Sequence, residues 1–443
     1  MLVEGWLTRA AVSRPEHIAL DTPSGSWSYA RLHAAARAGA AQLAGRGVGP
    51  AARVAIALPS GIEFAHALHA TLLLGATAVP IDLRLAAKER AMIASACDTL
   101  VEEPLWEGPA WELPASAGNA HDLDWPALVI HTSGTTSAPR PIELTYGNLL
   151  WSALGSAVAL GAPREERWLC TLPLSHVGGL SILIRSVIYA TTAVLHERFE
   201  TDRALHSLQE EDVTLVSLVA TTLARLLDAG LKDPPALRCA LTGGGPVPAA
   251  LIARAQAAGV PVSLTYGLTE SCSQVTTTPL AETAAMNAGA GPPLFCTEVR
   301  IAEDQEILVR GPTVASAAPA ADGWLHTGDL GSLDERGRLH VAGRKDDTIV
   351  SGGENVAPVE VEAVLEAHPL VMEAAVLGRP DPEWGEAVSA VVVARPGREL
   401  LEADLRAHCI AALARFKVPK EFQIVSGPLP RTRSGKLLRR ELR

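Results

Sequence analysis

Residues 127–141 read ALVIHTSGTTSAPRP, a short apolar run followed at once by small hydroxyl-bearing residues. The run 127–131 predicts a buried strand, because it is short, continuous and followed by turn-forming residues. The stretch 132–141 offers backbone N–H groups and hydroxyl donors with little steric bulk, which suits it to surround the oxygens of a triphosphate. It lacks the GxxxxGKS/T pattern, so a P-loop ATPase or kinase is not expected. Taken alone, such a stretch is more often an ordinary loop.

Similar apolar runs recur on both sides of this stretch and alternate with helical patterns. Short apolar strands alternating with helices predict βαβ units and largely parallel sheets covered on both faces. Ligands in such folds bind at the carboxyl ends of the strands, where the glycine- and hydroxyl-rich stretches of this chain stand. We expect strands at 53–58, 77–81, 127–131, 214–218, 238–242 and 261–265.

The pattern of expected strands and helices changes twice toward the C-terminus. Near residue 298, shorter strands and turns predict a small β subdomain, and beyond Asp346 the pattern indicates a separate α+β domain. There we expect helices at 359–368 and 401–415 and strands at 371–377, 387–393 and 421–425. The sequence therefore predicts an α/β protein with a large N-terminal domain, 1–345, of doubly wound, largely parallel sheets, and a small C-terminal domain, 346–443.

Composition excludes several classes of protein. The chain has 443 residues, 48% hydrophobic and 20% charged, which is typical of a globular protein. A formal net charge of −11 provides no basic surface for nucleic acid or anionic lipid. The N-terminus lacks a basic segment followed by an apolar core, so no signal peptide is expected. The apolar stretch 64–81 contains His66, His69, Gly75 and Pro80, and indicates a buried helix and a strand rather than a membrane span.

The six cysteines are scattered along the chain, with no CxxC pair. This pattern favours reduced thiols in the cytoplasm and speaks against a zinc site. His66 and His69 lie one helical turn apart without a carboxylate or cysteine at ligand spacing, so ordinary helix residues are expected. The sequence predicts a cytoplasmic protein without nucleic-acid partners or membrane insertion, and leaves open whether it forms a homo-oligomer.

The stretch TSGTTSAPRP resembles the phosphate-binding signature of the adenylate-forming superfamily, which includes acyl-CoA synthetases, peptide-synthetase adenylation domains and luciferases. Other stretches match the superfamily in the same order along essentially the whole chain. They are LPLSHVGG (172–179), GGGPVP (243–248), YGLTE (266–270), HTGDL (326–330), GRKDDTIVSGGENVAPVEVE (343–362) and PRTRSGKLLRREL (430–442). So many ordered motifs make a chance match negligible.

Within the superfamily, the chain most resembles the o-succinylbenzoate–CoA ligases of menaquinone biosynthesis. The matching stretches are LPLSHVGGLSILIRSVIYATTAVLHERF (172–199), VSLVATTLARLLD (216–228) and YGLTESCSQV (266–275). The resemblance implies that ATP, with Mg²⁺, activates 2-succinylbenzoate as an acyl-adenylate and that coenzyme A then takes the acyl group. The alternatives are an acyl-CoA synthetase for another aryl or medium-chain acid and, in a different class, a non-catalytic adenine-nucleotide-binding protein.

The resemblance also implies roles in nucleotide binding. Asp329 would accept hydrogen bonds from both ribose hydroxyls, with Arg344 at the same sugar. Glu270 would hold Mg²⁺ against the phosphates, with a surface helix cap as the alternative. The phosphates would contact Thr132, Ser133, Gly134, Thr135, Thr136 and Arg140, and the adenine would lie between Gly243, Gly244, Gly245 and Tyr266.

The resemblance places the catalytic lysine in the C-terminal domain. Lys436 would bridge the carboxylate and the α-phosphate, with Thr269 beside that phosphate; a merely basic tail is the alternative for Lys436. Asp346 would be the hinge about which the C-terminal domain turns between the two half-reactions. Gly352 and Gly353 would border the pantetheine tunnel, where missing side chains make room.

Arg185 falls in the middle of an otherwise apolar helical run, where a charge is costly unless it is paired. Succinylbenzoate carries a second carboxylate, remote from the activated one, that a guanidinium can bind in a bidentate manner. The alternative is an arginine that reaches solvent. Ser273 and Gln274 would line the same pocket, and His176 would either gate or orient the acid there or simply pack.

The phosphate loop departs from the usual TSGTTGxPKG at Ser137, Arg140 and Pro141. Arginine keeps the positive charge of lysine but is larger and planar, and proline removes an N–H and stiffens the chain. We therefore expect ATP to bind with an affinity altered by this loop. Ser175 stands where an aromatic residue is common before the histidine, which enlarges the expected acid pocket.

Overall fold

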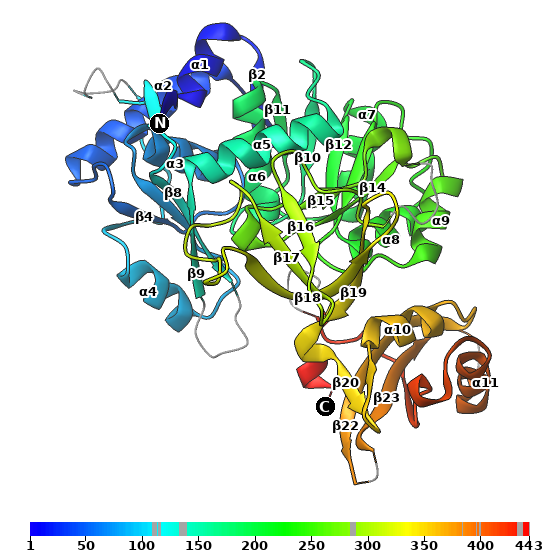
Figure 1. The fold of residues 1–443 in the computed structure, drawn as a ribbon. Helices are drawn as coiled ribbons and strands as arrows, with labels where there is room; N and C mark the ends of the chain where they lie inside the picture. Colours follow the sequence, from blue (N-terminus) through cyan, green and yellow to red (C-terminus); the bar gives the residue numbers. More distant parts are fainter. Residues whose placement is uncertain are drawn as a thin grey trace.

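The computed structural model describes the chain with a few gaps. The residues not described are 109–112, 114–116, 133–139, 284–288, 383, 396, 398–399, 432–436 and 443. The remaining residues form two largely parallel sheets, a small antiparallel sheet, a short two-stranded pair and a C-terminal α+β unit (Figure 1). The expected α/β architecture is therefore confirmed.

The first parallel sheet has five strands in the order β6-β4-β5-β8-β9. Four are parallel, and the edge strand β9 runs antiparallel to β8. Its strands are β4 (Arg53–Ile56), β5 (Thr77–Pro80), β6 (Thr99–Val101), β8 (Pro126–Thr132) and β9 (Arg140–Thr145). Strand β8 includes the apolar run ALVIH, as the sequence predicts.

The second sheet has eight strands in the order β15-β14-β13-β12-β10-β11-β2-β3 and is antiparallel only at its two edges. Its strands are β2 (Ile18–Thr22), β3 (Gly25–Ser28), β10 (Arg167–Cys170), β11 (Thr192–Leu195), β12 (Leu215–Leu218), β13 (Cys239–Thr242), β14 (Val262–Tyr266) and β15 (Thr276–Thr277). All six strands expected between residues 53 and 265 are thus present.

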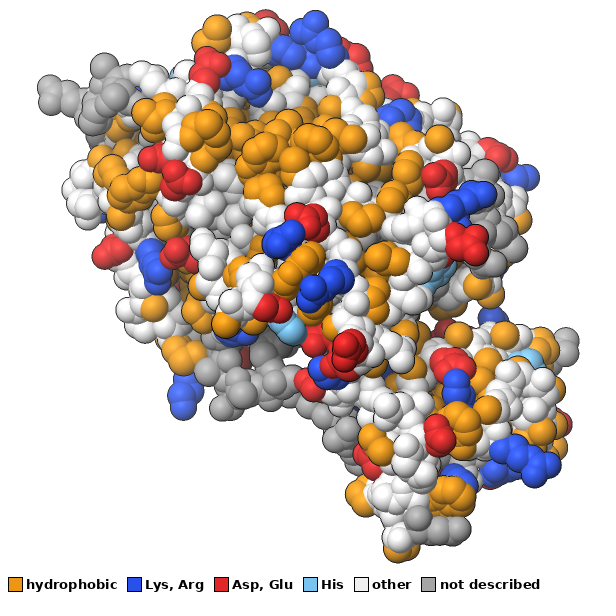
Figure 2. All heavy atoms as spheres, viewed as in Figure 1, with side chains coloured by type: hydrophobic (Ala, Val, Ile, Leu, Met, Phe, Trp, Pro, Cys, Tyr) orange, Lys and Arg blue, Asp and Glu red, His pale blue; other side chains and the backbone are white. Residues whose placement is uncertain are grey.

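Helices cover these two sheets. They are α1 (Trp6–Ser13), α2 (Tyr29–Gly45), α3 (Ile62–Leu73), α4 (Ala87–Ser95), α5 (Tyr146–Leu160), α6 (Val177–Tyr189), α7 (Thr201–Glu210), α8 (Ala220–Asp228) and α9 (Ala249–Ala257). Helix α5 begins with a reciprocal cap, because the Thr145 hydroxyl accepts from the Asn148 N–H at 3.1 Å and the Asn148 side chain accepts from the Thr145 N–H at 2.8 Å. Apolar side chains gather over α5 on the face seen in Figure 2, where Leu154 and Val158 are exposed.

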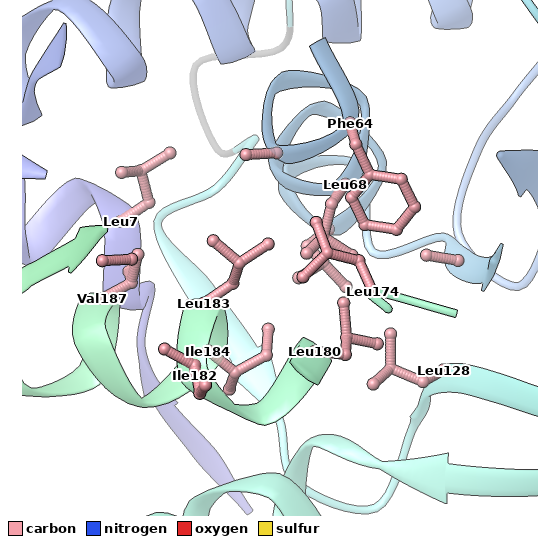
Figure 3. Close-up of a cluster of buried hydrophobic side chains, with 14 of the residues drawn as sticks. Leu7, Phe64, Leu68, Leu128, Leu174, Leu180, Ile182, Leu183, Ile184 and Val187 are labelled. Atoms are coloured by element: carbon pink, nitrogen blue, oxygen red, sulfur yellow. The ribbon is translucent and has the colours of Figure 1, made fainter. Parts of the chain in front are cut away.

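The largest hydrophobic cluster of the described residues includes buried side chains of α3 and α6. Phe64 and Leu68 of α3 lie near Leu174 and near Leu180 of α6 (Figure 3), and all four side chains are almost fully buried. Burying a side chain of this size stabilises the fold by about 1.5–3 kcal/mol. The stretch 64–81 is thus a buried helix followed by a strand, as expected, and no helix in the described ranges is long and apolar enough to cross a membrane.

The small β subdomain follows the parallel sheets. Four antiparallel strands stand in the order β16-β17-β18-β19, and their core contains Ile307, Val309, Leu325 and Leu339. The strands are β16 (Glu298–Ile301), β17 (Glu306–Arg310), β18 (Leu325–Leu333) and β19 (Leu339–Arg344). The two-stranded pair near the N-terminus consists of β1 (Leu2–Glu4) and β7 (Ala120–Asp122).

The C-terminal unit lies below β18 and β19 in Figure 1. It has its own sheet and hydrophobic core, with helices α10 and α11. Its elements are β20 (Ile349–Ser351), β21 (Glu354–Val356), α10 (Pro358–Glu366), β22 (Val371–Asp381), β23 (Gly385–Ala394), α11 (Glu402–Ala412) and β24 (Glu421–Val425). Each expected element is present, but β22 and β23 are longer and α11 is shorter than the sequence predicts.

Candidate active site

Two of the predicted motifs lie at the carboxyl ends of neighbouring parallel strands. Gly243 to Gly245 follow β13, and Tyr266 is the last residue of β14. A Cβ at Gly243 would lie 2.7 Å from the Thr265 carbonyl oxygen, and Gly244 has a φ of +77°. Glycine is therefore required at these two positions, and the bare backbone beside Tyr266 fits the flat face of a nucleotide base.

Three separate motifs meet at Asp329. The Tyr266 hydroxyl donates to Asp329 Oδ2 at 2.8 Å, and Arg344 Nε lies 2.8 Å from Asp329 Oδ1. Asp329 and Arg344 also face each other across β18 and β19. Burial raises the pKa of the Tyr266 phenol, and the Asp329 carboxylate adds to this effect, so the phenol stays a hydrogen-bond donor. A carboxylate held from two sides can accept from a pair of vicinal hydroxyls.

The segment after Tyr266 is tightly folded. A Cβ at Gly267 would lie 1.5 Å from the Ser273 carbonyl oxygen, so that position requires glycine. Cys272 and Ser273 have positive φ values of 55° and 94°, which cost about 1–3 kcal/mol each for residues other than glycine. Thr269 and Glu270 lie between Gly267 and Cys272, in a short 3₁₀ turn, and are part-buried. The Glu270 carboxylate is the kind of hard oxygen ligand that Mg²⁺ prefers.

Arg185 is fully buried in α6, with 2% of its surface exposed. Its Nη2 donates to Ser152 Oγ of α5 at 3.0 Å, and its guanidinium carbon lies 5.7 Å from the centre of the Trp168 ring. Among the described residues, no carboxylate lies within ion-pair distance of this guanidinium, and its Nε has no hydrogen-bond partner. The alternative of an arginine reaching solvent is therefore wrong.

Ser152 connects Arg185 to the remaining predicted pocket residues. Its hydroxyl donates to the Cys272 carbonyl at 2.7 Å, directly before Ser273 and Gln274. Gln274 is buried; its Nε2 donates to Thr277 Oγ1 at 2.8 Å, and its Oε1 finds no partner in the described part of the chain. The structure thus brings Arg185 next to the segment that holds Ser273 and Gln274.

His176 lies at the N-terminus of α6 against a charged pair that sequence reasoning missed. Its Nε2 is 3.2 Å from Arg84 Nη2 and 3.6 Å from Asp82 Oδ2. Burial lowers the pKa of the imidazole, an effect that Asp82 opposes and Arg84 reinforces. A neutral His176 can therefore accept a hydrogen bond from Arg84, and the gating or orienting role stays a prediction. Asp82 and Arg84 could have been found, because they directly follow the predicted strand 77–81.

The two ends of the predicted phosphate loop close a hairpin between β8 and β9. Thr132 faces Arg140, and its hydroxyl donates to the Arg140 carbonyl at 3.3 Å. Pro141 lies in the edge strand β9, a position where a missing N–H is tolerated. Ser133, Gly134, Thr135, Thr136 and Ser137 lie outside the described residues.

The hinge candidate and the glycine pair lie at the start of the C-terminal unit. Asp346 is the middle residue of a 3₁₀ turn, Lys345–Asp347, between β19 and β20. Gly352 and Gly353 connect β20 to β21 with φ values of +61° and +85°. A Cβ at Gly352 would lie 2.7 Å from the Trp384 ring, so the turn leaves no room for a side chain on that side.

Lys436 lies outside the described residues, but both ends of its segment are fixed. Arg431 and Leu437 form a β-bridge, and the Leu438 N–H donates to the Pro430 carbonyl at 2.8 Å. Arg431 pairs with Glu373 of β22 at 2.9 Å. Arg439 pairs with Glu362 of α10 at 2.8 Å and with Asp347 at 3.0 Å. The residues on both sides of the predicted lysine segment therefore contact the C-terminal unit.

The chain matches two known protein families along most of its length. Residues 7–102 and 98–317 match the family of AMP-binding enzymes, and residues 360–436 match the AMP-binding enzyme C-terminal domain. The chain belongs to this family, which confirms the resemblance drawn from the motifs.

Individual relatives give a more specific match than the family does. The chain is 38% identical to the 2-succinylbenzoate–CoA ligase of Bacillus subtilis (strain 168), covering 100% of this chain and 98% of that protein. Among solved structures, it resembles the o-succinylbenzoate CoA synthetase of Bacillus subtilis in complex with the acyl-adenylate intermediate OSB-AMP (TM-score 0.91, 37% identity, 100% and 98% coverage). It equally resembles that enzyme in complex with ATP and magnesium ion (TM-score 0.91, 36% identity, 100% coverage of both chains).

Proposed function

We propose that the chain is an ATP-dependent, AMP-forming ligase that joins 2-succinylbenzoate to coenzyme A. The reaction class follows from membership of the family together with the Tyr266, Asp329 and Arg344 cluster. The choice of substrate rests on Arg185, a buried guanidinium without a carboxylate partner among the described residues. Trapping the acyl-adenylate with hydroxylamine across a panel of acids tests the proposal. A protein that forms hydroxamate from no acid would be a nucleotide-binding protein without this activity.

The chemistry has two halves. A carboxylate oxygen of the acid attacks the α-phosphorus of ATP, and pyrophosphate leaves with the electrons of the broken P–O bond. The coenzyme A sulfur then attacks the acyl carbon, AMP leaves, and a thioester remains. A thiol with an ordinary pKa near 8.5 provides a few per cent of thiolate at neutral pH, so no dedicated base is required.

The first half-reaction brings two anions together, so the protein must supply positive charge and fixed donors. Lys436 would lie between the carboxylate and the α-phosphate, with Thr269 donating to that phosphate. Glu270 would hold Mg²⁺, which neutralises phosphate charge when it is bound. Asp329 and Arg344 would fix the ribose, as their close pairing supports.

The acid would lie between α6 and the segment after Cys272. Isolating a guanidinium from water costs several kcal/mol unless an anion compensates it. Ser152 and the Trp168 ring offset only part of this cost, since neither carries a negative charge. The second carboxylate of succinylbenzoate would compensate the charge of the Arg185 guanidinium, with Ser273 and Gln274 beside that carboxylate. An acid without that group would leave Arg185 uncompensated.

Replacing Arg185 by methionine should raise KM for succinylbenzoate at least about tenfold, because a buried charge-assisted hydrogen bond is lost while the side-chain bulk remains. Acids without a second carboxylate serve as the internal control and should change little. The measurement is steady-state kinetics on both kinds of acid. An equal loss on all acids would make Arg185 a purely structural residue.

Arg140 is exposed at the start of β9 and keeps the positive charge of the phosphate loop. Arg140→Ala should raise KM for ATP clearly more than KM for the acid, since the nucleotide loses a charged contact. Arg140→Lys, which restores the usual residue of the family, should leave KM for ATP close to or below the wild-type value. An unchanged KM for ATP in the alanine variant would remove Arg140 from the site.

We also propose that the domains divide at residues 345 and 346 and that Asp346 is the hinge. In one orientation Lys436 would serve adenylate formation, and in the other Gly352 and Gly353 would admit the pantetheine arm of coenzyme A. The contacts of Arg431 and Arg439, on either side of Lys436, with the C-terminal unit support this, because a rotation about Asp346 would carry the lysine with it.

We place the protein in the cytoplasm, since all six cysteines are free and most are buried. Its partners are the acid, ATP and coenzyme A. Self-association stays a prediction, and the exposed apolar residues of α5 are the surface to examine first.

A further inference from the structure

Glu306, the first residue of β17, belongs to none of the motifs, yet its carboxylate is almost completely buried, with 6% of the residue exposed. It accepts from the Gly328 N–H at 2.8 Å and from Lys345 Nζ at 3.2 Å, and it lies 3.4 Å from His326 Nδ1. These three partners come from different parts of β18 and from the turn after β19.

Two of these partners flank the residues proposed to bind the ribose. Gly328 directly precedes Asp329, has a φ of +70° and donates its N–H to the Glu306 carboxylate. Lys345 directly follows Arg344 and directly precedes the hinge candidate Asp346. One buried carboxylate therefore holds the chain immediately beside both members of the Asp329 and Arg344 pair.

These contacts also stabilise the ionised form of Glu306. Burial alone would raise the pKa of Glu306, but the Gly328 N–H and the Lys345 ammonium outweigh it and hold the pKa below its usual range. Glu306 is therefore ionised at neutral pH. Removing this ionised acceptor would leave the Gly328 N–H without its partner and would remove one of the two carboxylates that pair with the Lys345 ammonium, the other being Asp304.

We propose that Glu306 is a positioning residue that ties the ribose-binding turn to the hinge segment. It acts through the Gly328 peptide, with Lys345 as its second partner, so that the orientation of Asp329 depends on the Glu306 carboxylate. The inference rests on the proposed use of ATP and adds a residue that the motifs do not contain.

The test compares ATP with 2′,3′-dideoxy-ATP, which lacks both hydroxyls that Asp329 would bind. In Glu306→Ala, kcat/KM for ATP should fall about tenfold, while kcat/KM for the dideoxy nucleotide should stay within about twofold of wild type. KM for the acid should not change. Glu306→Gln keeps an oxygen that can accept from Gly328, so it should recover most of the preference for ATP.

Asp304→Asn is the matched control, because Asp304 also pairs with Lys345, at 2.6 Å, but does not contact Gly328. It should retain the full preference for ATP. Glu306→Ala losing activity equally with both nucleotides, or keeping the wild-type preference, would overturn the inference. Wild-type protein that forms no adenylate from either nucleotide would instead overturn the proposed function, so the two failures are distinguishable.

Discussion

Replacing Lys436 by alanine is expected to slow acyl-adenylate formation about a hundredfold or more and to leave thioester formation from synthetic acyl-adenylate near the wild-type rate. A unit charge about 4 Å from another, at an effective dielectric near 20, contributes about 4 kcal/mol. That corresponds to roughly a thousandfold in rate if the charge acts only in the transition state. The second half-reaction does not require charge at the α-phosphate, so it should not depend on the lysine.

Two rates are measured separately. One is the rate of adenylate formation from the acid and ATP, and the other is the rate of thioester formation from supplied acyl-adenylate and coenzyme A. Arg440→Ala is the control, because it removes a neighbouring positive charge from the same basic segment. If both variants slow adenylate formation equally, the segment is only a basic tail. Equal impairment of the two half-reactions by Lys436→Ala, with circular dichroism unchanged, would contradict the division of labour between orientations.

Replacing Asp346 by proline should give the opposite pattern, with adenylate formed at a near-normal rate and thioester formation reduced at least about a hundredfold. Proline fixes φ near −65°, and a rotation of the C-terminal unit about this turn requires the backbone dihedrals to change. The variant should therefore be confined to one orientation. The turn has only three residues, Lys345–Asp347, so neighbouring positions offer little compensation.

Asp346→Ala separates stiffness from charge, because it removes the carboxylate and leaves the backbone free. It should keep thioester formation within a few-fold of wild type. Should the alanine variant fail as badly as the proline variant, the carboxylate itself would be required and the hinge explanation would be wrong. A destabilised protein would differ from both, since it would lose the two half-reactions together.

The fold could be predicted well because apolar runs mark strands buried on both faces. The run 127–131 lies within β8, and the runs at 214–218 and 238–242 lie within one residue of β12 and β13. Errors occurred where hydrogen bonding continues beyond the apolar pattern. Strand β22 extends from Val371 to Asp381, because Arg379, Pro380 and Asp381 stay paired with β23 although they are polar or lack an N–H.

The site was only partly predictable. Sequence motifs identified Tyr266, Asp329 and Arg344, and the structure joins them through one carboxylate. Glu306 and Ser152 could not be identified, because each acts across contacts between segments distant in the chain, and no spacing in the sequence encodes such contacts. Arg185 could be singled out as an unusual charge, but only the structure shows the absence of a carboxylate beside it within the described residues.

The Ser152 hydroxyl has a consequence for engineering new acid preferences. It accepts a hydrogen bond from Arg185 of α6 and donates one to the Cys272 carbonyl, so a single hydroxyl links three segments of the chain. A chimaera that exchanges α6 alone would leave this serine facing a foreign side chain while still fixed to the Cys272 turn. Helices α5 and α6 and the turn after Tyr266 therefore form one recombination block.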